Sequence, residues 1–225
     1  MKIFKTAVIA AVVALALFLV SCAATPDADV TALRELSPAE EQEIMQLYGD
    51  CGLEGKLRYD IFRRAITGSR EFDFEKENLI TIIDFTRPST DKRFHVIDLE
   101  NRKVLFSTYV SHGVNTGENY AVEFSNEEGS RKSSLGFYRT AETYEGKHGY
   151  SLRLDGLQEG INERARERYI VIHSADYVSE EFIEKHGRLG RSWGCPALPV
   201  HLSDDIIDAI KEGSCLFIYA DADAD

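Results

Sequence analysis

Tyr169-Ile170-Val171-Ile172-His173 is an apolar, mostly β-branched run that ends in a histidine. β-branched residues favour strands, so this run predicts a buried strand whose last side chain is a base. A side chain at the end of a strand is firmly held and can be aimed into a cleft. We therefore expect a β domain in which His173 faces a functional site.

The rest of the chain supports a mainly β fold. Six further runs have strand character, at residues 79–85, 93–99, 103–110, 135–139, 150–154 and 215–219. Helices are expected at residues 38–48 after Ser37-Pro38-Ala39-Glu40, at 59–67, at 180–185, and at 203–211 with Ser203 as cap. Seven strands and few helices predict a mainly β domain with flanking helices, α+β overall.

Composition limits the classes of function. The chain has 225 residues, 44% of them hydrophobic and 28% charged, which is enough for one large domain or two small ones. Its formal net charge of −12 disfavours a surface that follows nucleic-acid phosphates.

The first residues predict export. Lys2 and Lys5 precede an apolar run at 7–20, which is short for a bilayer span, so we interpret residues 1–21 as a signal peptide; an uncleaved anchor helix is the alternative. Leu19-Val20-Ser21-Cys22 resembles a bacterial lipobox, which implies lipidation of Cys22 and a tether at residues 22–36. Ala24 then favours the outer membrane, with the protein facing the periplasm; ordinary signal cleavage after Ala23 or Ala24 is the alternative.

Three cysteines remain after Cys22, an odd number for an oxidising compartment. One arrangement pairs Cys51 with Cys215 and leaves Cys195 as a free thiol.

The free thiol lies in a glycine-rich loop, Gly190-Arg191-Ser192-Trp193-Gly194-Cys195-Pro196, 22 positions after His173 (195 − 173). A cysteine nucleophile needs a base or a cation nearby, and His173 and Arg191 are the candidates. The amides of Gly194 and Cys195 are candidates for an oxyanion hole. The alternative is a buried structural cysteine and a structural histidine. No H-x-x-x-H or C-x-x-C spacing is present, so we expect no metal and no cofactor.

Several ordered motifs are similar to one enzyme family. Residues 172–178 (IHSADYV) and 187–197 (GRLGRSWGCPA) resemble the L,D-transpeptidase (YkuD-like) catalytic family, in its murein L,D-transpeptidase branch. Segments that also fit are 83–85 (IDF), 94–99 (FHVIDL), 111–113 (SHG), 124–126 (FSN), 129–130 (GS), 133–138 (SSLGFY), 146–149 (GKHG) and 154–157 (LDGL). The resemblance covers about residues 56–219.

This resemblance implies a β-sandwich or barrel catalytic domain at residues 56–220, after a helical segment at 37–55. It implies that Cys195 attacks the bond between meso-diaminopimelate and D-alanine in tetrapeptide stems of peptidoglycan. The acyl group then passes to an amine, which forms a 3–3 cross-link, or to water. His173 matches the family's base, the Ser174 carbonyl orients its ring, and Gly194 matches the nucleophile loop.

The resemblance also suggests substrate-binding residues: His112, Asn126, Ser133, Ser134, Tyr138, His148, Arg188, Arg191, Ser192 and Trp193. For the residues outside segment 187–197, turn chemistry or strand packing is an alternative of at least equal weight. Arg188 would hold a substrate carboxylate through two hydrogen bonds, and a solvated charge is the alternative. The chain departs from the wider family at Trp193, where a histidine is usual, and at Ala197, where an arginine is common. A non-catalytic, murein-binding lipoprotein with the same fold is therefore the second hypothesis. A papain-like peptidase is disfavoured because its cysteine precedes its histidine.

Overall fold

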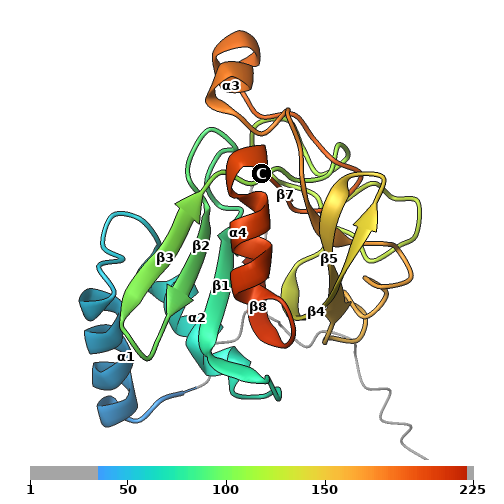
Figure 1. Ribbon diagram of the computed structural model, residues 1–225. Coiled ribbons are helices and arrows are strands. Elements are labelled where there is room, and N and C mark those ends of the chain that lie inside the picture. The colour runs from blue at the N-terminus through green and yellow to red at the C-terminus, as the bar shows by residue number, and fades with distance from the viewer. Residues whose placement is uncertain (1–34, 222–225) are drawn as a thin grey trace, which may run out of the picture.

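The computed structural model describes residues 35–221, which form four helices and eight strands (Figure 1). The helices are α1 (Pro38–Asp50), α2 (Tyr59–Ser69), α3 (Glu180–His186) and α4 (Val200–Ile210). The strands are β1 (Lys76–Asp84), β2 (Phe94–Asp98), β3 (Lys103–Thr108), β4 (Gly136–Gly146), β5 (Gly149–Gly156), β6 (Val171–Ser174), β7 (Ala197–Leu198) and β8 (Ser214–Tyr219). The predicted signal peptide and Cys22, and all but the last two tether residues, lie outside the described residues. None of the helices within residues 35–221 is long and apolar enough to span a membrane.

All eight strands belong to one mixed sheet, in the order β3-β2-β1-β8-β4-β5-β6-β7. Most neighbours are antiparallel, but β1 pairs in parallel with β8, and β6 pairs in parallel with β7. Beyond β3, Ser111 makes an isolated antiparallel bridge to Ala197 of β7. The two edges of the sheet thus approach each other, which confirms the expected mainly β, barrel-like architecture with flanking helices.

The central strand β8 is buried on both faces, which explains its continuous apolar sequence. Leu216 and Ile218 point into the core that α4 covers, whereas Cys215 and Phe217 point into a second core covered by α1 and α2. Successive side chains of a strand point to opposite faces, so a strand with two covered faces needs apolar residues at every position. In Figure 1, α4 lies over β8 and α1 and α2 lie beside β1–β3.

Helix α1 begins where its sequence predicts, because Ser37 and Glu40 form a reciprocal capping box. Helix α4 begins earlier than predicted. Its N-cap residue is Pro199. Ser203 lies buried inside the helix, and its amide donates to the Pro199 carbonyl, so its side chain does not cap the helix. The prediction of a Ser203 cap was therefore wrong, because the fixed backbone of proline suits a helix start just as well.

Two differences from the predicted strands shape the site. The β4–β5 hairpin is longer than expected and places its turn at Lys147 and His148. Strand β7 has only two residues, too few for a periodic pattern, yet it pairs Ala197 with His173 on β6. Through this pairing the cysteine loop runs beside the strand that carries the histidine.

Candidate active site

The Cys195 thiol lies against the beginning of β6. Its Sγ donates to the Tyr169 carbonyl at 3.5 Å, and Ala197, two residues later, is the register partner of His173. Cys195 is partly exposed and is a free thiol. The fold therefore places the loop of the predicted nucleophile beside the strand that carries the predicted base.

The charge near the thiol comes from Arg168, not from Arg191. Burial raises the pKa of the Cys195 thiol, while the Val171 amide and the positive charge of Arg168 act in the opposite direction. The Arg168 guanidinium donates to the carbonyls of Ser125 and Lys132, each at 2.7 Å, and among the described residues it has no carboxylate partner. Its charge is therefore available to a thiolate.

His173 is prepared to act as a base. Its Nδ1 lies 2.9 Å from the Ser174 carbonyl, which fixes Nδ1 as the donor and leaves the lone pair on Nε2. The side chain is 3% exposed, and this burial lowers its pKa; the hydrogen bond to Ser174 opposes the shift, and the nearby His148 adds to it. A neutral imidazole with a free Nε2 can accept a proton near neutral pH.

The exposed His148 covers His173. Their rings stack with centroids 4.4 Å apart and planes inclined by 25°. His148 reaches this position from the turn between β4 and β5, so the long hairpin presents one side chain to the base. The structure thus brings together His148, His173 and the Cys195 loop.

No hydrogen bond between the Cys195 thiol and the His173 ring is present among the described residues, because the thiol donates to Tyr169 instead. Proton transfer therefore requires a rotation of the thiol or one intervening water. Catalytic hydrogen bonds commonly tighten only when substrate binds.

One of the two candidate oxyanion amides is already occupied. The Gly194 amide donates to Ser192 Oγ at 3.1 Å, and that hydroxyl donates to the Cys195 carbonyl at 2.6 Å. The Cys195 amide has no acceptor within the part of the chain that the structure describes. Cys195 N–H is thus the available donor, and Ser192 shapes the turn that exposes it.

The turn at Gly194 tolerates no side chain. Its φ is +124°, and a Cβ there would lie 2.7 Å from the Lys132 carbonyl. Ser133 Oγ donates to the Gly194 carbonyl at 3.0 Å and accepts from the Gly113 amide at 3.1 Å. Segments 111–117 and 132–134 therefore hold the nucleophile loop from behind.

With this geometry in place, comparison with known families is decisive: the L,D-transpeptidase catalytic domain matches residues 53–219. The chain belongs to the L,D-transpeptidase family. The match covers both Cys195 and His173 and confirms the resemblance in the sequence.

Solved structures of similar fold include L,D-transpeptidases. One from Mycobacterium smegmatis is 13% identical, with a TM-score of 0.39 over 64% of this chain and 59% of that one. L,D-transpeptidase 1 of Mycobacterium tuberculosis is 16% identical, with a TM-score of 0.36 over 63% and 62%. The helical cell shape determining protein Pgp2 of Campylobacter jejuni is 15% identical, with a TM-score of 0.46 over 67% and 50%. The chain thus spans less than two thirds of each of these proteins. A comparison with curated proteins finds no significant match.

In this L,D-transpeptidase family member, His112 is part of the support behind the loop. It is 1% exposed; its Nδ1 accepts from the buried Arg93 at 2.7 Å, and its Nε2 donates to the Gly117 carbonyl at 3.2 Å. Burial, followed by the charge of Arg93, lowers the pKa of His112 to about 3. Both ring nitrogens are occupied, so the ring fixes segment 111–117.

Other predicted substrate contacts also have protein partners. Tyr138 is fully buried, with its hydroxyl 2.7 Å from Ser134 Oγ. Asn126 bridges Glu163 and the Arg164 amide. These residues order the loops around Arg168.

Arg188 and Arg191 share one carboxylate. Glu118 binds Arg188 Nε at 2.9 Å and Arg191 Nη1 at 2.7 Å. The Glu118 side chain is 73% exposed, so a competing carboxylate can reach the same pair. Trp193 differs from all of these because it is 71% exposed, and its ring lies 4.5 Å beneath the Arg131 guanidinium.

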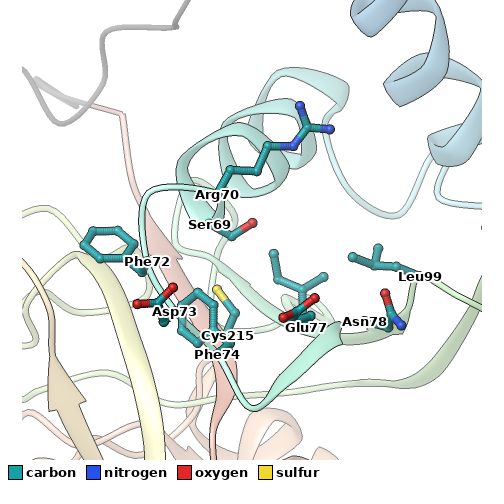
Figure 2. Close-up of a pocket in the computed structure, with 10 residues that line it drawn as sticks. Ser69, Arg70, Phe72, Asp73, Phe74, Glu77, Asn78, Leu99 and Cys215 are labelled. Carbon is teal, nitrogen blue, oxygen red and sulfur yellow. The ribbon is translucent and has the colours of Figure 1, made fainter.

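The second cysteine region lies away from this site. Cys51 and Cys215 are both free and buried, so the predicted disulfide between them is wrong. Cys215 contributes to a cavity of about 300 Å³, shown in Figure 2. Phe72, Phe74, Asp73 and Glu77 also line this cavity, and none of the predicted site residues does. Within residues 35–221 no cluster of three metal-ligating side chains is present.

Proposed function

We propose that the chain is a cysteine-dependent peptidoglycan L,D-transpeptidase that acts on tetrapeptide stems. The observation that carries the proposal is the β6–β7 pairing, which places the loop of the free Cys195 thiol beside the strand that carries His173, whose Nδ1 faces the Ser174 carbonyl and leaves Nε2 free. Membership of the L,D-transpeptidase family supports the same reaction class.

In the first half-reaction, His173 Nε2 takes the thiol proton, directly or through one water. The Cys195 sulfur attacks the meso-diaminopimelate carbonyl, and Cys195 N–H donates to the oxygen that becomes negative. When the tetrahedral adduct collapses, the C–N bond to D-alanine breaks, and the imidazolium returns its proton to the leaving amine. The products are a thioester on Cys195 and free D-alanine.

In the second half-reaction, the acyl group leaves the sulfur. An amine of a second stem attacks the thioester and forms a 3–3 cross-link, or water attacks and releases a tripeptide. His173 removes a proton from the attacking group, and the thiolate accepts a proton as it leaves. Arg168 favours the thiolate in both halves because its charge is not neutralised by a carboxylate.

We place this activity in the bacterial envelope. The signal-like residues 1–21 and the lipobox-like Cys22 support export and a lipid anchor that faces the periplasm, with the outer membrane favoured. Peptidoglycan is accessible in that compartment. Mass spectrometry of the mature amino terminus tests the anchor, because an unmodified residue after Cys22 contradicts it.

A non-catalytic, murein-binding lipoprotein is the second candidate. It is favoured by the thiol's hydrogen bond to Tyr169 in place of His173 and by the burial that raises the pKa of Cys195. A protein of this kind would bind stems and leave the diaminopimelate–D-alanine bond intact.

The two candidates are separated by incubation of the mature protein with a disaccharide-tetrapeptide. We expect release of D-alanine, and a mass increase on Cys195 after treatment with a carbapenem. Cys195→Ala should abolish both signals, while the matched variant Cys215→Ala, far from the site, should retain them. Binding without D-alanine release, and without acylation, favours the lipoprotein hypothesis.

A further inference from the structure

The turn that precedes β6, at residues 165–170, ends with two hydrogen bonds of the kind that terminate helices. The Ile170 amide donates to the Ala165 carbonyl at 2.9 Å, and the Tyr169 amide donates to the Arg166 carbonyl at 3.1 Å. These two bonds define a Schellman motif, whose left-handed position falls on Tyr169, at φ +56°.

Glycine is the usual residue at this position, because a Cβ in the left-handed region contacts the backbone. A bulky aromatic residue there is an outlier that needs a reason. The packing of Tyr169 supplies none: the residue is 72% exposed and belongs to none of the apolar cores. Its hydroxyl has no hydrogen-bond partner in the part of the chain that the structure describes. The ring therefore contributes little to the fold.

The position of Tyr169 indicates where its ring is used. The left-handed backbone aims the Tyr169 carbonyl at the Cys195 thiol, and the side chain leaves the same residue toward solvent. Trp193, the other strongly exposed aromatic near the thiol, lies two residues before Cys195. Two exposed aromatic rings thus emerge from the residues that surround the nucleophile.

We propose that Tyr169 is a specificity-determining residue whose ring packs on the donor stem peptide beside the bond that Cys195 attacks. The proposal rests on the function proposed above and adds a substrate contact to it. An aromatic face suits the methylenes and flat amides of a stem peptide, which offers few other apolar groups. This use explains why a residue that strains the backbone occupies the site.

The test uses Tyr169→Gly and Tyr169→Phe in the mature protein, with Glu212→Gly as the matched control. Glu212 is exposed, has φ +62° and lies after α4, away from the site. Both glycine variants relieve a left-handed residue, so we expect the Tm of each to rise by about 2 °C. Glycine also keeps the Tyr169 carbonyl in place, so iodoacetamide should alkylate Cys195 at the wild-type rate.

Only the substrate contact should separate the variants. We expect Tyr169→Gly to lower kcat/KM for disaccharide-tetrapeptide by about tenfold, an ordinary value for one lost aromatic contact. Tyr169→Phe and Glu212→Gly should stay within about twofold of wild type, since each retains the ring. In the Cys195→Ala background, Tyr169→Gly should weaken binding by the same factor, so the Kd for disaccharide-tetrapeptide should rise about tenfold.

Unchanged kcat/KM and unchanged Kd in Tyr169→Gly overturn the role of the ring and leave the proposed function standing. A lower Tm in Tyr169→Gly, but not in Glu212→Gly, also overturns it, because the ring then supports the fold. No turnover by wild type, with Kd still raised by Tyr169→Gly, overturns catalysis alone. No binding by any variant overturns both.

Discussion

The two thiols Cys195 and Cys215 show how surroundings decide the chemistry of one residue type. Cys215 lies in the middle of the sheet, 3% exposed, and burial alone raises the pKa of its thiol. Cys195 is also penalised by burial, but the Val171 amide and the Arg168 charge oppose the shift. No neighbouring charge or amide offsets the burial of Cys215 in the strand, whereas the loop beside β6 offers Cys195 an amide and a cation.

The sharpest test of this difference is thiol alkylation in the folded protein. Iodoacetamide should react with Cys195 at least about a hundredfold faster than with Cys215, because only exposed thiols with thiolate character react quickly. Peptide mass spectrometry after timed quenching measures both rates. In urea the two rates should converge; equal rates in the folded state would contradict the comparison.

Removing the positive charge of Arg168 should make the reactivity of the Cys195 thiol more like that of the Cys215 thiol. We expect Arg168→Gln to slow alkylation of Cys195 at pH 7 by about tenfold, because the thiolate loses a nearby positive charge. Arg191→Gln is the matched control, since Glu118 already holds that guanidinium, and its rate should remain within about twofold. If Arg191→Gln slows alkylation more than Arg168→Gln does, Arg191, as the sequence suggested, is the residue that favours the thiolate.

Acid should destabilise the segment that supports the Cys195 loop. Burial lowers the pKa of His112 to about 3, so below the ordinary histidine pKa the unfolded chain binds a proton that the folded chain refuses. Stability present at pH 7 is therefore lost as the pH falls, by about 2 kcal/mol at pH 5. Hydrogen exchange should show segment 111–117 losing protection before β8. His201→Gln, at an exposed site, should leave this pH dependence unchanged, whereas His112→Gln should reduce it.

The smallest expected effect comes from removing the His148 ring that stacks on His173. His173 must be neutral to accept a proton, so activity falls as the pH drops through its pKa. His148→Ala exposes the ring and removes a nearby charge, which raises the pKa of His173 and moves the acidic limb to higher pH. We expect kcat/KM at pH 6 to fall about twofold. His148→Phe, which keeps the cover, should shift the limb less; equal shifts would mean that the charge alone matters.

The sequence predicted what depends on local pattern. The apolar run of β8, the capping box at Ser37 and the order of His173 before the glycine-flanked Cys195 can all be recognised without coordinates. The family resemblance added the reaction class. These features are encoded by neighbours along the chain.

The features that the sequence did not predict depend on contacts between distant segments. Arg168 was overlooked because, with Arg164 and Arg166, it reads as a solvated charge run, yet its acceptors lie at residues 125–134. The occupied Gly194 amide requires the position of the Ser192 hydroxyl, which no spacing rule supplies. The free state of Cys51 and Cys215 likewise follows from packing and not from counting cysteines.

The contacts that hold the nucleophile loop also determine when, during folding, Cys195 acquires its surroundings. Segments 111–117, 132–134 and 168–171 must all be in place before Cys195 acquires its surroundings. A nascent or unfolded polypeptide therefore carries a cysteine with no fixed base, cation or amide donor beside it. The arrangement that the proposed acyl transfer needs arises only with the completed domain.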